Sequence, residues 1–466
     1  MTDEDNVMKH IWMLLALLPA VTNAQQQYDC SVATSYRLTV QDTGQASFSS
    51  LSTSTSCTPV SEATPPPDPD PNPDPNPNPT PVTGVAPPMS SAQTPRLDYM
   101  MQQFSWYKDT SYDDLNAWLY DRVQLLYELY IRTNDENVHA EALKSAQYYV
   151  QQYNDASQCK GGWGGAGIDP CNFKYTYASA CWYVLKVDGQ ALCDEQRLST
   201  LYEYYKKTGW NATGILDPGI ANPETFNTTE RNVGYALMGL QYVYRTAQDQ
   251  GYVALASNVE TTIHQTIQWL YEWQAKTAFG AWMHSYNGHE GSGTPGQNDW
   301  LMFSPWQSAI LTGALWRTWS AGIHSDTCGT NNEPCIPEML IKFAQAMESY
   351  GWVDNPKQYE PYAWSHDANT TGQIAWYIAT PDDFAKQLQI QNADGYYSDE
   401  HNPENQCQMA LGYYFSQDAS QKSAFQARYR ALDSFYVPAM ANISDPPRIA
   451  AWQNSSNPSC EWLIEQ

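Results

Sequence analysis

The 466-residue sequence is poor in basic side chains, with 24 Lys and Arg against 50 Asp and Glu and a formal net charge of -26. A surface of this sign repels phosphate groups, which argues against nucleic acid as a partner. Outside one stretch near the N-terminus, the sequence lacks an apolar run long enough to cross a bilayer, so we expect no membrane partner. It also lacks a GxSxG motif, which argues against a serine nucleophile of that type.

The one apolar run has the features of an export signal. Lys9 and His10 precede it, and it ends in small residues at Ala24. A short basic segment followed by an apolar one and a small-residue cleavage site is typical of a secretory signal peptide. We therefore expect residues 1–24 to be removed, with Met8 as the natural start, and the protein to be secreted, either extracellular or periplasmic.

The ten cysteines include no CxxC pair, which makes structural zinc or thiol chemistry a poor explanation for them. In an exported chain, cysteines usually form disulfides because the compartment is oxidising. Near neighbours in the sequence suggest the following pairs: Cys30 with Cys57, Cys159 with Cys171, Cys181 with Cys193, Cys328 with Cys335, and Cys407 with Cys460.

Composition divides the mature chain into three parts. Residues 25–60 alternate like a strand and are too few to fold well without their disulfide. Residues 61–93 form a spacer rich in Pro, Asp and Asn, which cannot pack a core and should be extended. Residues 94–466 have helical periodicity and form the predicted catalytic domain, which we expect to be monomeric.

The helical periodicity of this large domain comes in six pairs. Long loops between successive pairs open on glycine and an aromatic residue, as in "GGWGGAGIDPCNF" and "FGAWMHSYNGHEG". This pattern predicts an all-α fold, an (α/α)6 toroid whose first helices line the inner wall and whose loops gather around a cleft. The predicted pairs are 112–132 with 136–153, 174–187 with 194–207, 230–249 with 255–276, 303–320 with 337–350, 369–379 with 382–392, and 404–417 with 421–435.

Two loop segments carry groups suited to moving a proton. Arg231 and Asn232 stand where a loop enters an inner helix, and His284, Tyr286 and His289 lie together in "WMHSYNGHEG". β-Elimination from a uronic acid needs donors that neutralise the carboxylate, a base that removes the C5 hydrogen, and an acid that protonates the departing oxygen. These residue types supply that set.

In architecture and loop residues, the domain resembles the toroidal alginate and glucuronan lyases. The resemblance implies cleavage of a uronic-acid polysaccharide by β-elimination. It assigns neutralisation to Asn232 and Arg231, the base to His284 or His289, and the acid to Tyr286. Other polar or aromatic loop residues would bind the sugar chain: Trp163, Lys174, Trp282, Trp306, Trp364, His366 and His401.

Three alternatives use the same loops differently. A glycoside hydrolase would need two carboxyl groups across the cleft, for which Glu230 and Glu290 are the candidates. A non-catalytic carbohydrate-binding protein would keep the aromatics without the proton donors. We expect no cofactor. The third alternative is a zinc or calcium site, in which His284 and His289 and a further loop residue would be the ligands.

Overall fold

The structure is a computed structural model, and the chain divides into two compact units, Met1–Asn78 and Pro79–Gln466. The division falls within the predicted spacer. The residues that the structure describes are 28–40, 46–59, 101, 104–105, 108–109, 112, 122–152, 175–207, 229–276, 280–285, 301–323, 326–328, 333–353, 373–374, 378–379, 402–441 and 463–464.

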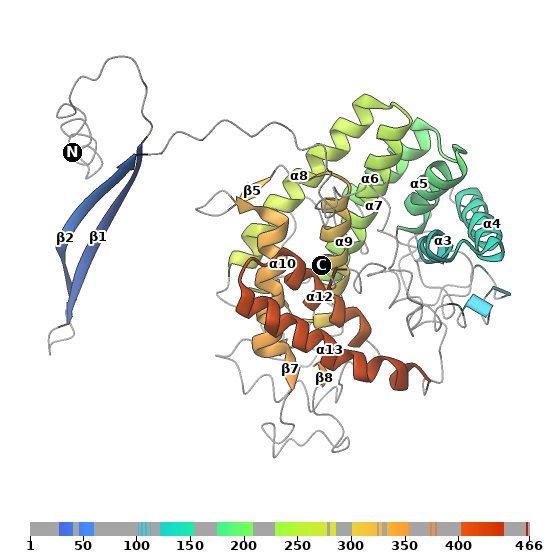
Figure 1. The fold of residues 1–466 in the computed structure, drawn as a ribbon. Helices are drawn as coiled ribbons and strands as arrows, with labels where there is room; N and C mark the ends of the chain where they lie inside the picture. The colour runs from blue at the N-terminus through green and yellow to red at the C-terminus, as the bar shows by residue number, and fades with distance from the viewer. Residues whose placement is uncertain are drawn as a thin grey trace, which may run out of the picture. The chain divides into compact units, whose positions relative to one another are not determined.

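The first unit contains a two-stranded antiparallel ribbon. Strand β1 (Tyr28–Val40) pairs with β2 (Ala46–Pro59), and the register places Cys30 directly opposite Cys57. This is the strand conformation expected for the segment, and the opposition of the two cysteines is the geometry that their predicted disulfide requires. The ribbon is the blue pair of arrows in Figure 1.

Helices dominate the described part of the second unit, which confirms the all-α prediction (Figure 1). Five of the six predicted helix pairs are present at the expected places. The ten α-helices are α3 (Arg122–Thr133), α4 (Glu136–Gln152), α5 (Thr176–Asp188), α6 (Glu195–Lys207), α7 (Glu230–Asp249), α8 (Val253–Ala275), α9 (Pro305–Ser320), α10 (Cys335–Ala346), α12 (Asn402–Phe415) and α13 (Ala419–Ala441), and a π-helical turn, η5 (Met347–Gly351), extends α10.

Residues that tolerate left-handed backbone end several of these helices. Asn134 (φ 54°) lies between α3 and α4, and Gly251 (φ 76°) lies between α7 and α8. Gly189 caps α5 with φ 67°, and its N–H donates to the Leu185 carbonyl. Glycine and asparagine reach this conformation at low cost, so they allow tight reversals between paired helices.

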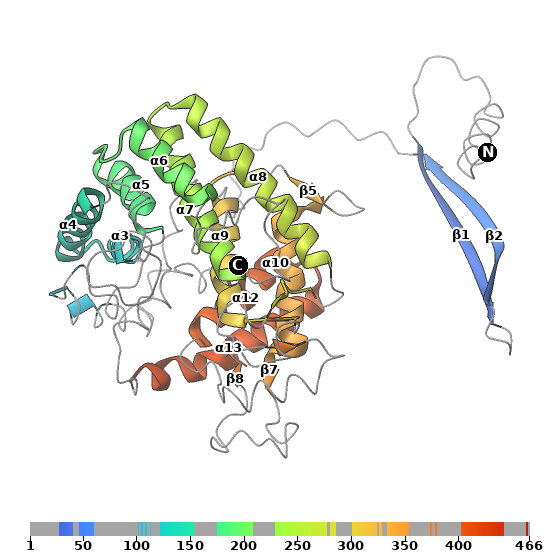
Figure 2. The same ribbon diagram turned by 180° about the vertical axis from the view of Figure 1, so that it is seen from behind.

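The first helices of successive pairs are neighbours in chain order. α3 contacts α5, α5 contacts α7, and α7 contacts α9, with α12 packed on the other side of α9. Both ribbon views show α7, α9 and α12 close together, with α3 to α6 on one flank (Figures 1 and 2). The second helices pack on this row: α8 contacts α7, α10 contacts α12, and α8 and α10 also contact each other.

The fifth predicted pair is wrong in its first half. The segment expected as a helix over 369–379 contains strand β8 (Gln373–Ile374) and strand β9 (Ile378–Ala379). Its short apolar run is rich in isoleucine and aromatics, which suit a strand as well as a buried helix. α12 lies directly against α9 and α10, so no helix from this segment separates them. The partner segment, 382–392, lies outside the described residues.

The other strands are short and connect loops to helices. β3 (His284–Ser285) pairs with β4 (Leu301–Phe303), which also pairs with β9. β5 (Thr327–Cys328) pairs with β6 (Glu333–Pro334), and β7 (Trp352–Val353) pairs with β8. All of these pairings are antiparallel. The β3–β4 pairing matters most below, because it fixes the position of His284 next to the start of α9.

Two of the predicted disulfides are confirmed. Cys181 of α5 is bonded to Cys193, just before α6, and Cys328 of β5 is bonded to Cys335 at the start of α10. Cys407 is also disulfide-bonded. The partner predicted for it, Cys460, and the predicted pair Cys159 and Cys171 lie outside the described residues.

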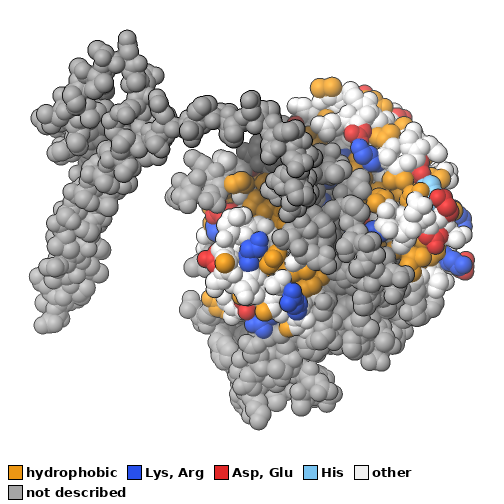
Figure 3. All heavy atoms as spheres, in the orientation of Figure 1, with side chains coloured by type: hydrophobic (Ala, Val, Ile, Leu, Met, Phe, Trp, Pro, Cys, Tyr) orange, Lys and Arg blue, Asp and Glu red, His pale blue; other side chains and the backbone are white. Residues whose placement is uncertain are grey.

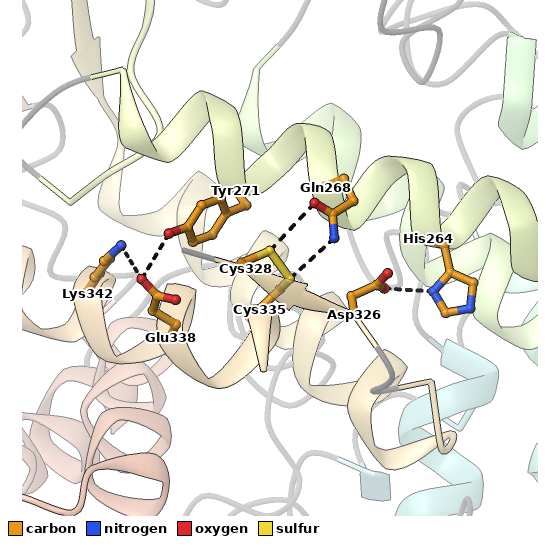
Figure 4. Close-up of a disulfide and its surroundings, with 8 residues drawn as sticks. All are labelled: His264, Gln268, Tyr271, Asp326, Cys328, Cys335, Glu338 and Lys342. Atoms are coloured by element: carbon orange, nitrogen blue, oxygen red, sulfur yellow. Dashed lines mark hydrogen bonds and ion pairs between the residues drawn. A yellow bond between two sulfur atoms is a disulfide. The ribbon is translucent and has the colours of Figure 1, made fainter. Parts of the chain in front are cut away.

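Side chains of α8 fasten this helix to the segment around the second disulfide (Figure 4). His264 Nδ1 lies 2.7 Å from Asp326 Oδ2, and Gln268 Nε2 donates to Cys335 Sγ at 3.5 Å. One turn further on, Tyr271 donates to Glu338 at 3.1 Å. His264 therefore has a structural partner in Asp326.

The described surface of the helical unit does not present a single sign of charge on the face shown in Figure 3. Lys and Arg side chains stand among Asp, Glu and apolar ones there.

The close approach of α7 and α9 depends on Gly234. A Cβ at this position would lie 2.9 Å from the backbone nitrogen of Leu311 and 3.0 Å from the carbonyl carbon of Ile310. We expect Gly234→Ala to lower the free energy of unfolding by about 1–3 kcal/mol, because backbone atoms have no room to move aside. Urea denaturation measures this. Ala254→Ser, which adds one atom at an exposed position of α8, should have little effect, and equal stability of both variants would contradict the close packing.

Candidate functional site

The candidate site lies where α7 and α9 begin. Thr229, the residue before α7, is extended (φ -130°, ψ 163°), and Ser304, the residue before α9, is followed by Pro305 in the first helical position. Proline favours this position because its fixed φ suits the helix and its missing N–H is not needed there. The first residue of α7 is Glu230, and a carboxylate is favoured at the positive end of a helix dipole.

Glu230 joins the two helix starts. Its Oε1 accepts a hydrogen bond from the Ser304 backbone N–H at 3.1 Å and another from the Ser308 hydroxyl at 3.3 Å. All three residues are fully buried. A carboxylate buried in a protein needs such donors. Without them, the loss of hydration of the charge costs on the order of several kcal/mol.

His284 completes this arrangement. Its Nδ1 lies 2.6 Å from Glu230 Oε2, and both side chains are fully buried. The pairing of β3 with β4 places His284 opposite Met302, two residues before Ser304. This strand pairing holds the His284 backbone next to the start of α9. Nδ1 and Oε2 form a close ion-pair contact without hydrogen-bond geometry, and the other ring nitrogen, Nε2, is buried and has no hydrogen-bond partner among the described residues.

The geometry gives the two ring nitrogens different roles. A carboxylate at Nδ1 favours the tautomer that carries its proton there, and Nε2 then keeps a lone pair that accepts a proton. A buried acceptor without a partner is uncommon in proteins, since most such atoms are hydrogen-bonded. The pair can therefore serve as a base, with Glu230 orienting the imidazole and Nε2 taking the proton.

Arg231 and Asn232 follow Glu230 on the first turn of α7, and both are buried. The guanidinium carbon of Arg231 lies 5.0 Å from the centre of the Trp306 ring, within the range of a cation–π interaction. Asn232 Oδ1 has no hydrogen-bond partner among the described residues. Arg231 thus lies at the same pair of helix starts as His284, and its neutralising role stays a prediction.

Two tryptophans expected to stack on sugars are core side chains instead. Trp282 is fully buried, packs on Phe343 with ring centres 5.3 Å apart, and donates its indole N–H to the Leu270 carbonyl at 3.0 Å. Trp306 is 1% exposed and lies under Arg231. Neither ring has an open face for a sugar, because adjacent helices cover positions that the sequence places in or beside a loop.

The remaining predicted site residues lie outside the described residues. They are Tyr286, His289, Trp163, Lys174, Trp364, His366 and His401, together with Glu290 of the hydrolase alternative. Of the predicted catalytic set, the structure places Arg231, Asn232 and His284 at the starts of α7 and α9.

Sequence reasoning missed the two serines and gave Glu230 a different role. Ser304 and Ser308 were not considered as site residues, although they stand one helical turn apart at the start of a helix, where both can face the same neighbour. Glu230 was a candidate only for hydrolysis. The contact that changes its role, with His284, joins positions far apart in the sequence and has no local signal.

A second buried polar cluster lies toward the other ends of these helices. Arg317 of α9 pairs with Glu128 of α3 at 2.6 Å, and the Tyr183 hydroxyl donates to the same carboxylate at 2.7 Å. Burial and the Glu128 charge raise the pKa of Tyr183 well above its usual value. Burial opposes the charge of Arg317, but Glu128 and nearby tyrosines outweigh it and raise the pKa of the guanidinium. Both groups therefore hold their protons.

Arg245 also belongs to this second cluster. It donates to the Arg317 carbonyl at 2.8 Å and lies over the Trp182 ring at 4.8 Å. Burial lowers its pKa to about 10, so it remains a cation at neutral pH. Although α5 and α7 lie between α3 and α9 in the row, the Glu128–Arg317 ion pair joins α3 directly to α9.

Comparisons with protein families, curated proteins and solved structures find no match for this chain. Within the described ranges, no group of three or more His, Cys, Asp and Glu side chains is placed to hold a metal ion. The zinc or calcium alternative would therefore need ligands outside those ranges. Among the described helices, none has both the length and the apolar character needed to cross a membrane.

The tautomer of His284 is a direct test of this geometry. In the neutral imidazole we expect Nδ1 to carry the proton and Nε2 to be bare, measured by the side-chain nitrogen shifts of histidine-labelled protein. His139 provides the contrast, because its Nε2 lies 2.5 Å from Asp188 and should carry its proton there. Glu230→Gln should change the His284 nitrogen shifts and leave those of His139 unchanged. An imidazole protonated only at Nε2 would contradict the assignment.

Proposed function

We propose that this protein is a secreted polysaccharide lyase that cleaves a uronic-acid polymer of the alginate or glucuronan type by β-elimination. The observation that carries the proposal is the buried pair of Glu230 and His284, whose contact at 2.6 Å leaves Nε2 of the imidazole unpartnered. A base in a fixed orientation is the group that elimination requires first.

In the proposed reaction, Nε2 of His284 removes the hydrogen at C5 of a uronic acid residue. The electron pair left at C5 forms the C4–C5 double bond, and the bond from C4 to the glycosidic oxygen breaks. That oxygen takes a proton, for which Tyr286 remains the candidate. Glu230 stabilises the imidazolium that forms, because its carboxylate stays beside Nδ1 throughout.

The step also needs neutralisation of the substrate carboxylate, since C5 becomes acidic only when the neighbouring negative charge is compensated. Arg231 supports this part, because its guanidinium is buried one residue from Glu230. The starts of α7 and α9 add the partial positive charge of two helix dipoles. A buried cation and two helix N-termini suit an acidic sugar better than a neutral one.

The hydrolase alternative is less well supported. A hydrolase would use Glu230 as acid, base or nucleophile on a sugar, but both of its oxygens are engaged by Ser304, Ser308 and His284. A carboxylate held in this way suits the orientation of an imidazole. We therefore rank hydrolysis second, and a non-catalytic carbohydrate-binding protein third, because the latter has no use for an oriented base.

The proposed toroidal architecture agrees with the order in which the helices pack. A row in which α3, α5, α7, α9 and α12 are successive neighbours is what one inner wall of a toroid would give. The ion pair between α3 and α9 supports its curvature. Since α12 follows α9 directly, the proposal requires five helical pairs in the wall in place of the six predicted.

Export fits the described disulfides. Cys181–Cys193 and Cys328–Cys335 are each closed between residues near in sequence, and such bonds persist in oxidising compartments. A secreted enzyme would also meet a polysaccharide outside the cell. We therefore keep secretion as part of the proposal.

The assay that tests the function follows two signals in parallel. With alginate or glucuronan, we expect both ultraviolet absorbance from the new C4–C5 double bond and new reducing ends. His284→Ala should lower turnover by about 10²–10⁴-fold, the usual contribution of a general base. His264→Asn, at a partly exposed histidine of α8 that bonds to Asp326, is the matched control and should retain turnover.

Each other outcome assigns a different function. Reducing ends without the absorbance would indicate hydrolysis and would remove the proposed role of His284. Neither signal on alginate, glucuronan, xylan or mannan would favour the binding protein. Loss of activity with a chelator would revive the metal alternative.

A further inference from the structure

We infer that Asn405 of α12 binds the carboxylate of the acidic sugar, a role that the sequence assigned to Asn232. The inference rests on the proposed function for the identity of the ligand, but not for the geometry. Asn405 is fully buried, and its Nδ2 has no hydrogen-bond partner among the described residues. A buried amide nitrogen with two unused N–H groups is a donor that a ligand can satisfy.

The orientation of the Asn405 amide is fixed by its neighbours. Gln408 faces the Pro305 carbonyl at 2.9 Å, and a peptide carbonyl only accepts, so the Gln408 atom there is Nε2. The same Nε2 lies 3.1 Å from the Asn405 side chain, which must therefore present its oxygen. Nδ2 of Asn405 consequently points away from Gln408, with both hydrogens available.

This donor belongs to the same set of helix starts as the Glu230–His284 pair. Gln408 binds Pro305, while Glu230 binds the neighbouring residue Ser304, so α12 and α7 flank the first turn of α9. Near their other ends, Arg245 of α7 bonds to Arg317 of α9, and Trp316 of α9 packs on Phe415 of α12. The three helices therefore run parallel, and their N-termini meet at one end.

An anion is the ligand that these features share. Three parallel helix N-termini place partial positive charge at this end. Neither Thr229 nor Ser304 makes a side-chain capping bond to its own helix. The Glu230 carboxylate contacts Ser304, Ser308 and His284, on the side of the first turn of α9 that faces α7.

Asn232 fits this role less well than Asn405. Its unpartnered atom is Oδ1, an acceptor, which would repel a carboxylate. The unpartnered atom of Asn405 is instead Nδ2, a donor. Its orientation is set through Gln408 by the Pro305 carbonyl. The carboxylate of a uronic acid is the class of ligand we assign to it, because an amide N–H donates to a carboxylate oxygen and the polymer proposed above carries a carboxylate on every residue.

The experiment measures binding of D-glucuronate and of D-glucose to the full chain by nuclear magnetic resonance titration. The wild-type protein should bind the acid more tightly than the neutral sugar. Asn405→Asp keeps an acceptor for Gln408 but replaces the donors by an oxygen, and we expect it to weaken D-glucuronate binding at least about tenfold. Asn405→Ser, which removes both amide N–H groups without adding charge and leaves a shorter hydroxyl, should weaken it less, yet in the same direction.

Asn258→Asp is the matched control, because it adds the same charge at an exposed position of α8. It should bind D-glucuronate like the wild type. Circular dichroism and the urea midpoint establish that each variant is folded. Unchanged D-glucuronate affinity in either folded Asn405 variant would overturn the inference, and so would a wild-type protein that binds the two sugars equally.

Binding separates this inference from the proposed function. If His284→Ala leaves turnover intact, the elimination mechanism fails, but selective loss of D-glucuronate on changing Asn405 would still identify the carboxylate site. If His284→Ala abolishes turnover and Asn405→Asp binds D-glucuronate normally, the mechanism stands and the role of Asn405 is wrong.

Discussion

The buried carboxylate of Glu230 is the constraint on which the candidate site depends. It sits where α7 begins and joins this helix to the start of α9 and to strand β3 through Ser304, Ser308 and His284. A charge with no exposure must find donors within the protein, so these three partners have to converge on it. The same requirement that stabilises the carboxylate therefore fixes the position and the tautomer of the imidazole.

Much of the helical arrangement could be predicted from local pattern, and the exception has a physical reason. Long amphipathic segments such as 230–249 extend over several turns, which separates them from strands by period alone. The segment 369–379 has a short apolar run, and its conformation depends on which strands are available to pair with it. Partners for β8 and β9 come from β7 and β4, which lie earlier in the chain and cannot be identified by periodicity.

The chemistry of the site was only partly visible in the sequence. Arg231 and His284 stand out because ionisable groups at helix starts and in loops are candidates by type, and both lie at the helix starts. The tryptophans at 282 and 306 were assigned to sugar binding because they lie in or next to a loop, but whether a ring is covered depends on the packing of other helices. Asn405 gives no local sign, since its orientation comes from Gln408 and a carbonyl on α9.

The two buried polar clusters differ in the partner of their carboxylate, which is an arginine in one and a histidine in the other. At one end, Glu128 is paired with Arg317, a permanent cation, and the neighbouring Tyr183 has a raised pKa, so the protons stay in place. At the other end, the partner of Glu230 is an imidazole, whose second nitrogen, Nε2, is buried without a hydrogen-bond partner among the described residues. The proposed proton transfer therefore fits the end where α7, α9 and α12 begin, while the Glu128 cluster joins α3 to the opposite end of α9.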